Sequence, residues 1–298
     1  MDKKIIIVTH DGVFHSDDVF AVAALLITLE KAPVVVNIIR TRDADEIRKA
    51  DFVVDVGSDY DESRNRFDHH QIGGAGVRQN SIPYASFGLV WKKFGKDISG
   101  SEDVVSVVDR ILVAPIDAYD AGVDLFKSIL PDVLPYSIDD YIHDLRPTWQ
   151  EDPLSVDKRF LEAVAFGRKV LEREVACAKA FVDAKTIVEK AYQESPDKRL
   201  VLLDSFYPYE ETLAVFPEPL FVVSPRLDGS WNVKSVRDDL ASFKNRKDLP
   251  ESWAGKRDAE LAGITGVSDA IFCHTARFLA VTKSKEGALK LAKIAIGA

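Results

Sequence analysis

Residues 5–18 of the chain read Ile5-Ile6-Ile7-Val8-Thr9-His10-Asp11-Gly12-Val13-Phe14-His15-Ser16-Asp17-Asp18. The first four residues form a continuous β-branched run, which is the pattern of a strand buried on both faces in a parallel sheet. Gly12 marks a turn, and Ser16 and Asp17 can cap the free N–H groups of a helix that follows. The stretch therefore predicts a strand, a polar turn and a helix, the repeating unit of an α/β fold.

This pattern continues through the first part of the chain. Apolar runs at 34–39 and 52–56 predict two more strands, with a short charged helix at 44–49 between them. Strands that alternate with helices at this spacing indicate a mostly parallel sheet with helices on both faces. The carboxyl ends of such strands are where open α/β sheets place their sites.

The middle of the chain separates two parts. Residues 131–153 contain four prolines, which indicate a linker, and residues 158–191 carry a long helical pattern that predicts a bridging helix. The length suggests two domains. We therefore expect a catalytic domain at 1–152 and, at 153–298, the bridging helix with a substrate domain.

The C-terminal part has a different pattern. Apolar runs predict strands at 199–203 and 220–224, and the Asp228-Gly229 pair predicts a tight turn into a further strand at 231–236. Hairpins of this kind are antiparallel. The expected fold class is therefore α/β, with a smaller mixed α/β domain after the bridging helix.

Composition is that of an ordinary globular protein. The 298 residues are 46% hydrophobic and 29% charged, and no apolar run approaches the roughly 20 residues that span a bilayer. The N-terminus matches neither a secretory signal nor a transit peptide, so we expect a cytoplasmic protein without a membrane partner. The net charge of −9 argues against broad capture of long nucleic acid, yet permits a local basic groove. Cys177 and Cys273 fit no zinc spacing and are interpreted as buried structural side chains.

Histidine and aspartate gather in the N-terminal part. Four of the six histidines, namely His10, His15, His69 and His70, fall in two short segments. Imidazole and carboxylate form the mixed ligand set that divalent transition metals favour. Helix capping could explain Ser16 and one aspartate, but not the two histidines beside them. Asp55 lies within an apolar run, where an acidic residue is costly unless it is paired or coordinated. These residues predict a metal-dependent hydrolase with a phosphate ester as substrate.

The motifs also resemble a known group of proteins. Asp68-His69-His70, after an apolar run with Asp55, resembles the DHH phosphoesterase superfamily, which includes RecJ-type exonucleases and manganese pyrophosphatases. Residues 9–18 look like the first motif of the Myg family (UPF0160), and the likeness extends to 249–253, 263–266 and 285–289. It covers nearly the whole chain. The resemblance implies a DHH-type N-terminal domain with metal-dependent hydrolase or exonuclease activity.

The resemblance implies a site for two divalent ions. Mn²⁺ is the expected metal, with Mg²⁺, Fe²⁺ or Zn²⁺ as alternatives. Asp55 would bridge both ions, and His70 would face the substrate as a catalytic residue. The other ligands would be His10 and His15 for one ion, and Asp17, His69 and Asp117 for the second, with Asp18 and Asp120 as alternatives to their neighbours.

The C-terminal part is expected to recognise the substrate. Arg226, Lys234 and Arg237 are the candidates for binding an anion. We expect His274 to be a second catalytic residue, facing the metals across a cleft between the domains. The chain departs from the family pattern at Ala121, where the family has Asn, and at Ala280 and Val281, where it has glycines that allow close approach of a ligand.

Three functions stay open at this point. The first is an exonuclease-like phosphodiesterase on short RNA or DNA, the second a hydrolase of a small phosphorylated metabolite or nucleotide, and the third a metal-binding scaffold without turnover. The intact ligand set favours an enzyme over a scaffold. The acidic net charge and the missing glycines make the hydrolysis of a small metabolite more plausible relative to the exonuclease than the motifs alone would suggest. Peptide hydrolysis has no support, because no nucleophile constellation stands out. A homodimer also stays open.

Overall fold

The computed structural model describes residues 3–298. They form two compact units, one ending at Lys179 and the other covering Ala180–Ala298, and each has its own five-stranded sheet. The long helix α7, Val156–Glu194, begins in the first unit and ends in the second. Most of the predicted bridging helix is thus grouped with the first unit, and the predicted domain boundary after residue 152 remains a prediction. None of the helices among residues 3–298 combines the length and the apolar character needed to cross a bilayer.

The sheet of the N-terminal unit is mostly parallel, as predicted. β1 pairs in parallel with β2 and β3, β3 pairs in parallel with β5, and only the short β4 runs antiparallel to its neighbour β5. The strand order is β2-β1-β3-β5-β4. The strand bounds are Lys3–Thr9 for β1, Val34–Arg40 for β2, Phe52–Val54 for β3, Tyr60–Asp61 for β4 and Arg66–Phe67 for β5.

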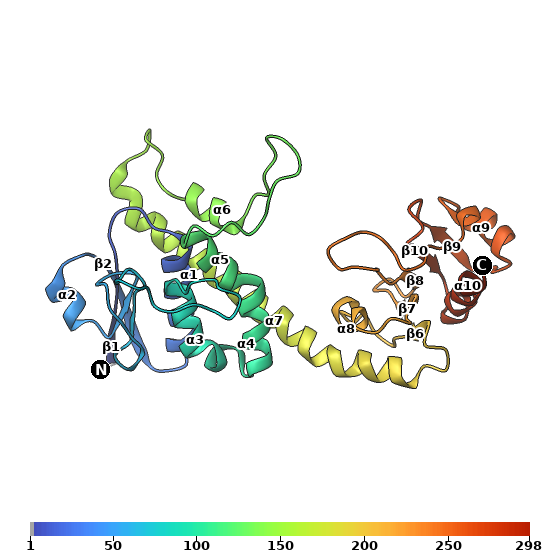
Figure 1. Ribbon diagram of the computed structural model, residues 1–298, viewed down its shortest axis with the longest axis horizontal. Coiled ribbons are helices and arrows are strands. Elements are labelled where there is room, and N and C mark those ends of the chain that lie inside the picture. Colours follow the sequence, from blue (N-terminus) through green and yellow to red (C-terminus); the bar gives the residue numbers. More distant parts are fainter. Residues whose placement is uncertain (1–2) are drawn as a thin grey trace. The chain divides into compact units, whose positions relative to one another are not determined.

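Helices cover both faces of this sheet (Figure 1). Helix α1, Ser16–Leu29, packs against α3, Ser86–Ser99, and contacts β2 and β3. The first ten residues of α1 are all buried, which is what an almost entirely apolar helix requires. On the other face, α2 (Ala44–Lys49) packs Ile47 against a small cluster that includes Val8. The runs of β3 and the end of β1 are therefore buried on both sides, whereas β2, at the edge of the sheet, leaves Val35 exposed.

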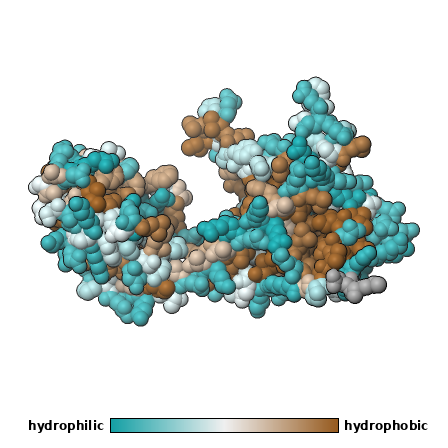
Figure 2. Space-filling view, turned by 180° about the vertical axis from the view of Figure 1, so that it is seen from behind, coloured by the Kyte–Doolittle hydropathy of each residue, from teal (hydrophilic) through white to brown (hydrophobic). Residues whose placement is uncertain are grey.

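Further helices complete the unit. They are α4 (Glu102–Val108), α5 (Ala114–Asp120) and α6 (Ile138–Asp144). Helix α6 lies within the stretch that the prolines predicted as a linker, because Ser137 and Asp140 form a reciprocal cap at its start. The segment between α5 and α6 stands away from the unit and has a hydrophobic tip (Figures 1 and 2). Its exposed apolar side chains include Ile129, Leu130 and Leu134.

The C-terminal unit contains the predicted mixed sheet. Its order is β6-β7-β8-β10-β9; β6 and β7 are parallel, and the other pairs are antiparallel. The predicted hairpin around Asp228-Gly229 is confirmed as the β7–β8 connection. The bounds are Leu200–Leu202 for β6, Glu210–Ala214 for α8, Phe221–Pro225 for β7, Trp231–Ser235 for β8, Asp258–Thr265 for α9, Ala270–Cys273 for β9, Leu279–Thr282 for β10 and Lys285–Gly297 for α10.

Candidate metal centre

The histidine-rich segments lie at the carboxyl ends of neighbouring parallel strands. His10 follows β1, Asp55 follows β3, and His69 and His70 follow β5. Because β3 pairs with both β1 and β5, these three strand ends lie side by side. Helix α1 begins next to the same edge and adds the acidic residues of its first turn. The fold therefore brings together segments that are far apart in the sequence, at the position expected for ligands in an α/β sheet.

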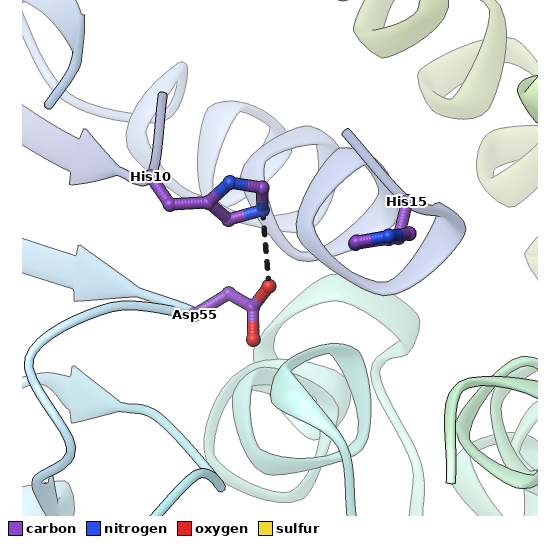
Figure 3. A group of neighbouring side chains, drawn as sticks. All are labelled: His10, His15 and Asp55. Atoms are coloured by element: carbon purple, nitrogen blue, oxygen red, sulfur yellow. Dashed lines mark ion pairs between the residues drawn. The ribbon is translucent and has the colours of Figure 1, made fainter. Parts of the chain in front are cut away.

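Asp55 is at the centre of this group. It follows β3 with a φ of 56°, in the left-handed region that Asp tolerates better than most residues. Its Oδ2 lies 3.2 Å from Nε2 of His10, and its Oδ1 lies 3.2 Å from Nε2 of His69. Figure 3 shows the His10 ring directed at this carboxylate, with His15 nearby at the start of α1. A carboxylate with a histidine at each oxygen is suited to bridging two cations.

A backbone hydrogen bond sets the orientation of His10. Its Nδ1 lies 2.8 Å from the carbonyl oxygen of Asp11 and must donate there, which leaves Nε2 as an electron-pair donor. That Nε2 is also 3.1 Å from Oδ2 of Asp18. One ligand atom each of His10, His15 and Asp55 lie within 4.8 Å of one another. These three residues can therefore hold one metal ion.

A second set of ligands surrounds His69. Its Nε2 lies 3.1 Å from Oδ2 of Asp120 and 3.8 Å from Oδ2 of Asp17. Ligand atoms of Asp17, Asp120 and His15 also lie within 4.8 Å of one another. Asp17 is fully buried at the start of α1, and Asp120 ends α5. Together with Asp55, these residues can hold a second ion.

Several buried atoms of this cluster have no hydrogen-bond partner within residues 3–298 outside the cluster itself. They are Nε2 of His10, Nε2 of His69, Oδ1 of Asp17 and Oδ2 of Asp18. Buried polar atoms are nearly always satisfied in folded proteins, and a buried carboxylate without compensation is costly. The donor set is the imidazole and carboxylate mixture of Mn²⁺, Fe²⁺ and Zn²⁺ sites. The residues therefore fit a divalent metal centre.

Burial and mutual proximity shift the pKa values of these side chains. Burial raises the pKa of Asp17 well above its usual range, and the nearby Asp55 adds to the effect. Burial would lower the pKa of His10 and of His69, but hydrogen bonds to the neighbouring carboxylates raise each to about 10. Burial likewise opposes ionisation of Asp55, yet these two histidines hold its pKa below the usual range. A divalent ion would take the place of the imidazolium charges.

Two residues that the sequence analysis did not assign a role shape the site. The buried Asp68 accepts hydrogen bonds from the backbone N–H groups of His69 and His70 at 2.7 and 3.1 Å, and its Oδ1 is 2.7 Å from Nδ1 of His70. Ser86, at the start of α3, donates its hydroxyl to Asp55 at 3.0 Å and its N–H to Asp17 at 3.3 Å. Asp68 could have been suspected from its place in the motif, but no local signal singles out Ser86.

Asp117 does not join the cluster of ligands. It is fully buried, its Oδ2 lies 2.7 Å from Nη1 of Arg78, and its Oδ1 accepts the backbone N–H of Gly88 at 3.0 Å. Burial raises its pKa to about 7, although Arg78 opposes the shift. The side chain that reaches His69 from α5 is Asp120, which the sequence analysis kept as the alternative.

The predicted substrate residues all lie in the C-terminal unit. Lys234 and Arg237 line one cavity of about 390 Å³, where Lys234 pairs with Glu210 at 2.9 Å. Arg226 lines a different cavity. His274 follows β9, with its ring 4.5 Å from that of Phe278 and its Nδ1 accepting the backbone N–H of Ala276. The structure therefore places the four predicted residues on one unit but not in one cavity.

Comparisons with known proteins give the family. A sequence model described as "Uncharacterised protein family (UPF0160)" matches residues 6–296. A "MYG1 protein" of Dictyostelium discoideum is 33% identical, covering 96% of this chain and 94% of that protein. A "MYG1 exonuclease" of Homo sapiens is 29% identical, covering 96% of this chain and 84% of that protein.

Solved structures show a weaker similarity. RecJ of Thermus thermophilus in complex with Mn²⁺ is 12% identical with a TM-score of 0.28, covering 98% of this chain and 52% of RecJ. That similarity is too low to support a statement about fold or activity. The family match covers nearly the whole chain and agrees with the resemblance found in the motifs. The chain belongs to the protein family UPF0160.

Proposed function

We propose that this protein is a divalent-metal-dependent phosphoesterase that removes nucleotides from the end of short RNA or DNA. The observation that carries the proposal is the set of buried ligand atoms of His10, His69 and Asp17 around Asp55, which have no partner among residues 3–298 outside this cluster. Relatives named MYG1 exonuclease favour a nuclease over the hydrolase of a small metabolite.

The proposed centre holds two ions, with Mn²⁺ as the expected metal. Asp55 is the shared ligand, because each of its oxygens faces a different histidine. We assign Asp120 to the place that the sequence analysis gave to Asp117, whose carboxylate is held by Arg78. The ligands are then His10, His15 and Asp55 for one ion, and Asp17, Asp55, His69 and Asp120 for the other.

Two bound ions supply a water of lowered pKa and neutralise charge on the phosphoryl oxygens. His70 is more than half exposed at the rim of the cluster, and Asp68 holds its Nδ1 at 2.7 Å. With Nδ1–H donated to Asp68, Nε2 of His70 carries the lone pair in the neutral ring and would pass a proton to the leaving oxygen only from the imidazolium form. Asp68 is thus a positioning residue. We retain His274, Arg226, Lys234 and Arg237 as proposed substrate contacts of the C-terminal unit.

The test is a substrate panel assayed after removal and readdition of metal. The panel contains single-stranded oligonucleotides blocked at one or the other end, a mononucleotide and a small phosphodiester, each with Mn²⁺ or Mg²⁺. We expect stepwise shortening of the oligonucleotides that requires metal. Asp55→Asn should lose bound metal and reduce turnover by several orders of magnitude, since the amide cannot bridge two cations. Asn also tolerates the left-handed backbone, so the fold should persist.

Asp45→Asn is the matched control, because this exposed carboxylate lies on α2 and pairs with Arg48. It should leave metal content and turnover unchanged. Full metal occupancy in Asp55→Asn would contradict the bridging role. Hydrolysis of the mononucleotide without any shortening of oligonucleotides would refute the proposed nuclease activity and indicate a phosphatase that acts on small molecules.

A further inference from the structure

The C-terminal unit has a second cavity, of about 670 Å³, that the proposed metal chemistry does not use. It lies where the β7–β8 turn meets β9 and β10. Its lining combines three cationic side chains, those of Arg226, Arg257 and Lys283, and one carboxylate, that of Asp228, with an apolar floor. The floor includes Phe272, Leu279 and Val281. None of these residues lines the cavity that contains Lys234 and Arg237.

The strand pattern places this cavity on the face of the sheet away from α10. Side chains alternate along β10, so Leu279 and Val281 face one side while Ala280 faces the other. Ala280 belongs to the core cluster that packs against α10. The apolar floor is therefore the β9–β10 end of a face that α7 and α8 cover farther along, at β6 and β7.

Two of the three cations lack an anionic partner within residues 3–298. Arg257 is exposed, and the contact that its side chain makes is with the ring of Phe272, whose centroid is 4.5 Å from the guanidinium carbon. Lys283 is exposed, and no carboxylate of residues 3–298 lies within ion-pair distance of its ammonium. Arg226 has a distant partner, Asp228, at 3.6 Å. Positive charge in this cavity is thus available to a ligand.

The charge distribution of the chain supports an anionic ligand. The residues from Ala180 onward include as many basic as acidic side chains, so the net charge of −9 lies in the N-terminal unit. The cavity is therefore not opposed by a general negative charge on its own unit. A guanidinium against an aromatic ring, beside free cations, is a combination that binds bases by stacking and phosphates by charge.

We propose that this cavity binds a nucleotide unit of a single-stranded nucleic acid. The phosphate contacts Arg257 and Lys283, with Arg226 at the edge. The base lies over the floor formed by Phe272, Leu279 and Val281. The inference rests on the proposed nuclease function and deepens it, because it gives the strand a binding site on the C-terminal unit that is distinct from the metal ligands.

The test measures binding of fluorescein-labelled oligothymidylate to the full chain by anisotropy, with chelator present so that the strand is not cut. The double variant Arg257→Ala/Lys283→Ala should weaken binding about tenfold or more. The slope of log affinity against log salt should fall by about 1.4, since each phosphate contact on a single strand contributes roughly 0.7. Phe272→Leu should weaken binding while leaving the salt slope unchanged, because it removes stacking but no charge.

Lys290→Ala/Lys293→Ala is the matched control. Both lysines are exposed on α10, on the other side of the sheet, and the control removes the same charge. It should bind the strand within about twofold of the unmodified chain. Equal affinities for the two double variants would overturn the proposal, provided that circular dichroism shows both to be folded.

Thymidine monophosphate separates a strand site from a free-nucleotide site. We expect it to compete only weakly, because it offers one phosphate and one base. Competition as strong as that of the oligonucleotide would overturn the strand assignment. Hydrolysis of the oligonucleotide panel with Mn²⁺ by the unmodified chain tests the proposed function separately. A chain that binds strands through this cavity but hydrolyses none would refute the nuclease and leave the cavity assignment standing.

Discussion

Asp55 shows how one backbone angle organises the metal centre. Its φ of 56° follows directly on β3, so the chain turns where the strand ends and the carboxylate lies between His10 and His69. Ser86 holds one oxygen of that carboxylate at 3.0 Å. The left-handed region disfavours β-branched and bulky residues, so this position favours Asp, Asn or Gly. Among these, only Asp provides the charge that two cations require.

The two adjacent histidines should have separable roles. His69→Ala should lose metal, because its Nε2 lies within 3.2 Å of Asp55 and Asp120. His70→Ala should retain metal and lose turnover, because its ring is more than half exposed and its Nδ1 is held by Asp68. Metal content measured after dialysis, together with kcat, checks both statements. Equal metal content in the two variants would disprove the division of roles.

The two cysteines should differ in reactivity. Burial raises the pKa of Cys273 to about 11, so little thiolate exists near neutral pH. The expectation that both cysteines are buried is wrong for Cys177, which is exposed on α7. Iodoacetamide at about pH 8 should modify Cys177 and leave Cys273 intact, since the thiolate is the nucleophile. Modification of Cys273 in the folded chain should begin only as the pH approaches 11. Peptide mass spectrometry reads both sites, and Cys177→Ser serves as the control. Rapid labelling of Cys273 at pH 8 would contradict its burial.

At the scale of elements, the contact between α3 and α5 determines which carboxylate of α5 reaches the metal centre. Asp117 and Asp120 are three residues apart, so they lie on neighbouring positions of one helical face. Arg78 forms an ion pair with Asp117, and the backbone N–H of Gly88 donates a hydrogen bond to the same carboxylate. Asp120 is left to face His69. The pair Arg78–Asp117 is therefore structural, and it sets the position of α5 relative to α3.

Gly88 is required by this contact. A Cβ at this position would overlap Oδ2 of Asp117 and lie 2.7 Å from Nη2 of Arg78. Ala normally stabilises a helix relative to Gly, but overpacking of a buried contact costs about 1–3 kcal/mol. Gly88→Ala should therefore lower the free energy of unfolding, as measured with urea, and reduce metal affinity by displacing α5.

Gly263→Ala is the control for this substitution. Gly263 also lies in a helix, α9, and an added Cβ would meet nothing within 4 Å. The change should raise the free energy of unfolding by about 0.5–1 kcal/mol. If Gly88→Ala raised the free energy of unfolding as much as Gly263→Ala does, the inference that α3 packs closely against Asp117 at Gly88 would be refuted.

At the scale of the whole molecule, charge and metal ligands are concentrated in one unit. The unit that ends at Lys179 carries the net negative charge and buries Asp17, Asp18 and Asp55 together. The C-terminal unit has its own core, built by α10 and the antiparallel strands. Metal binding should therefore raise the free energy of unfolding of the first unit and leave that of the C-terminal unit unchanged.

Hydrogen exchange with and without Mn²⁺ checks this expectation. At a free metal concentration about 100 times Kd, binding to the native state adds about 2.7 kcal/mol. Protection should rise in peptides that contain residues 8–18 and 52–70, and it should stay unchanged in the C-terminal sheet. Asp55→Asn should abolish the gain. An equal increase in hydrogen-exchange protection in both units, or no increase in either, would show that the side chains around Asp55 are not the principal metal site.

Local sequence patterns determined much of this protein. The β-branched runs predicted the parallel strands, the Asp228-Gly229 pair predicted the hairpin, and His10, His69 and Asp55 stood out as candidate ligands because their chemistry is unusual beside apolar runs. These signals depend on residues close together in the chain. They were sufficient for the fold class and for proposing which segments come together around Asp55.

Only the tertiary structure decided the remaining roles. Asp117 and Asp120 have the same chemistry and nearly the same helical position, so the choice between them depends on Arg78 and Gly88, which are about thirty or more residues away. The role of Ser86 depends in the same way on the packing of α3 against the strand ends. The periodicity of apolar residues and the spacing of motifs depend only on residues that are close together in the sequence. Which of two equivalent side chains meets a metal is determined by long-range packing, and that packing exists only in the folded chain.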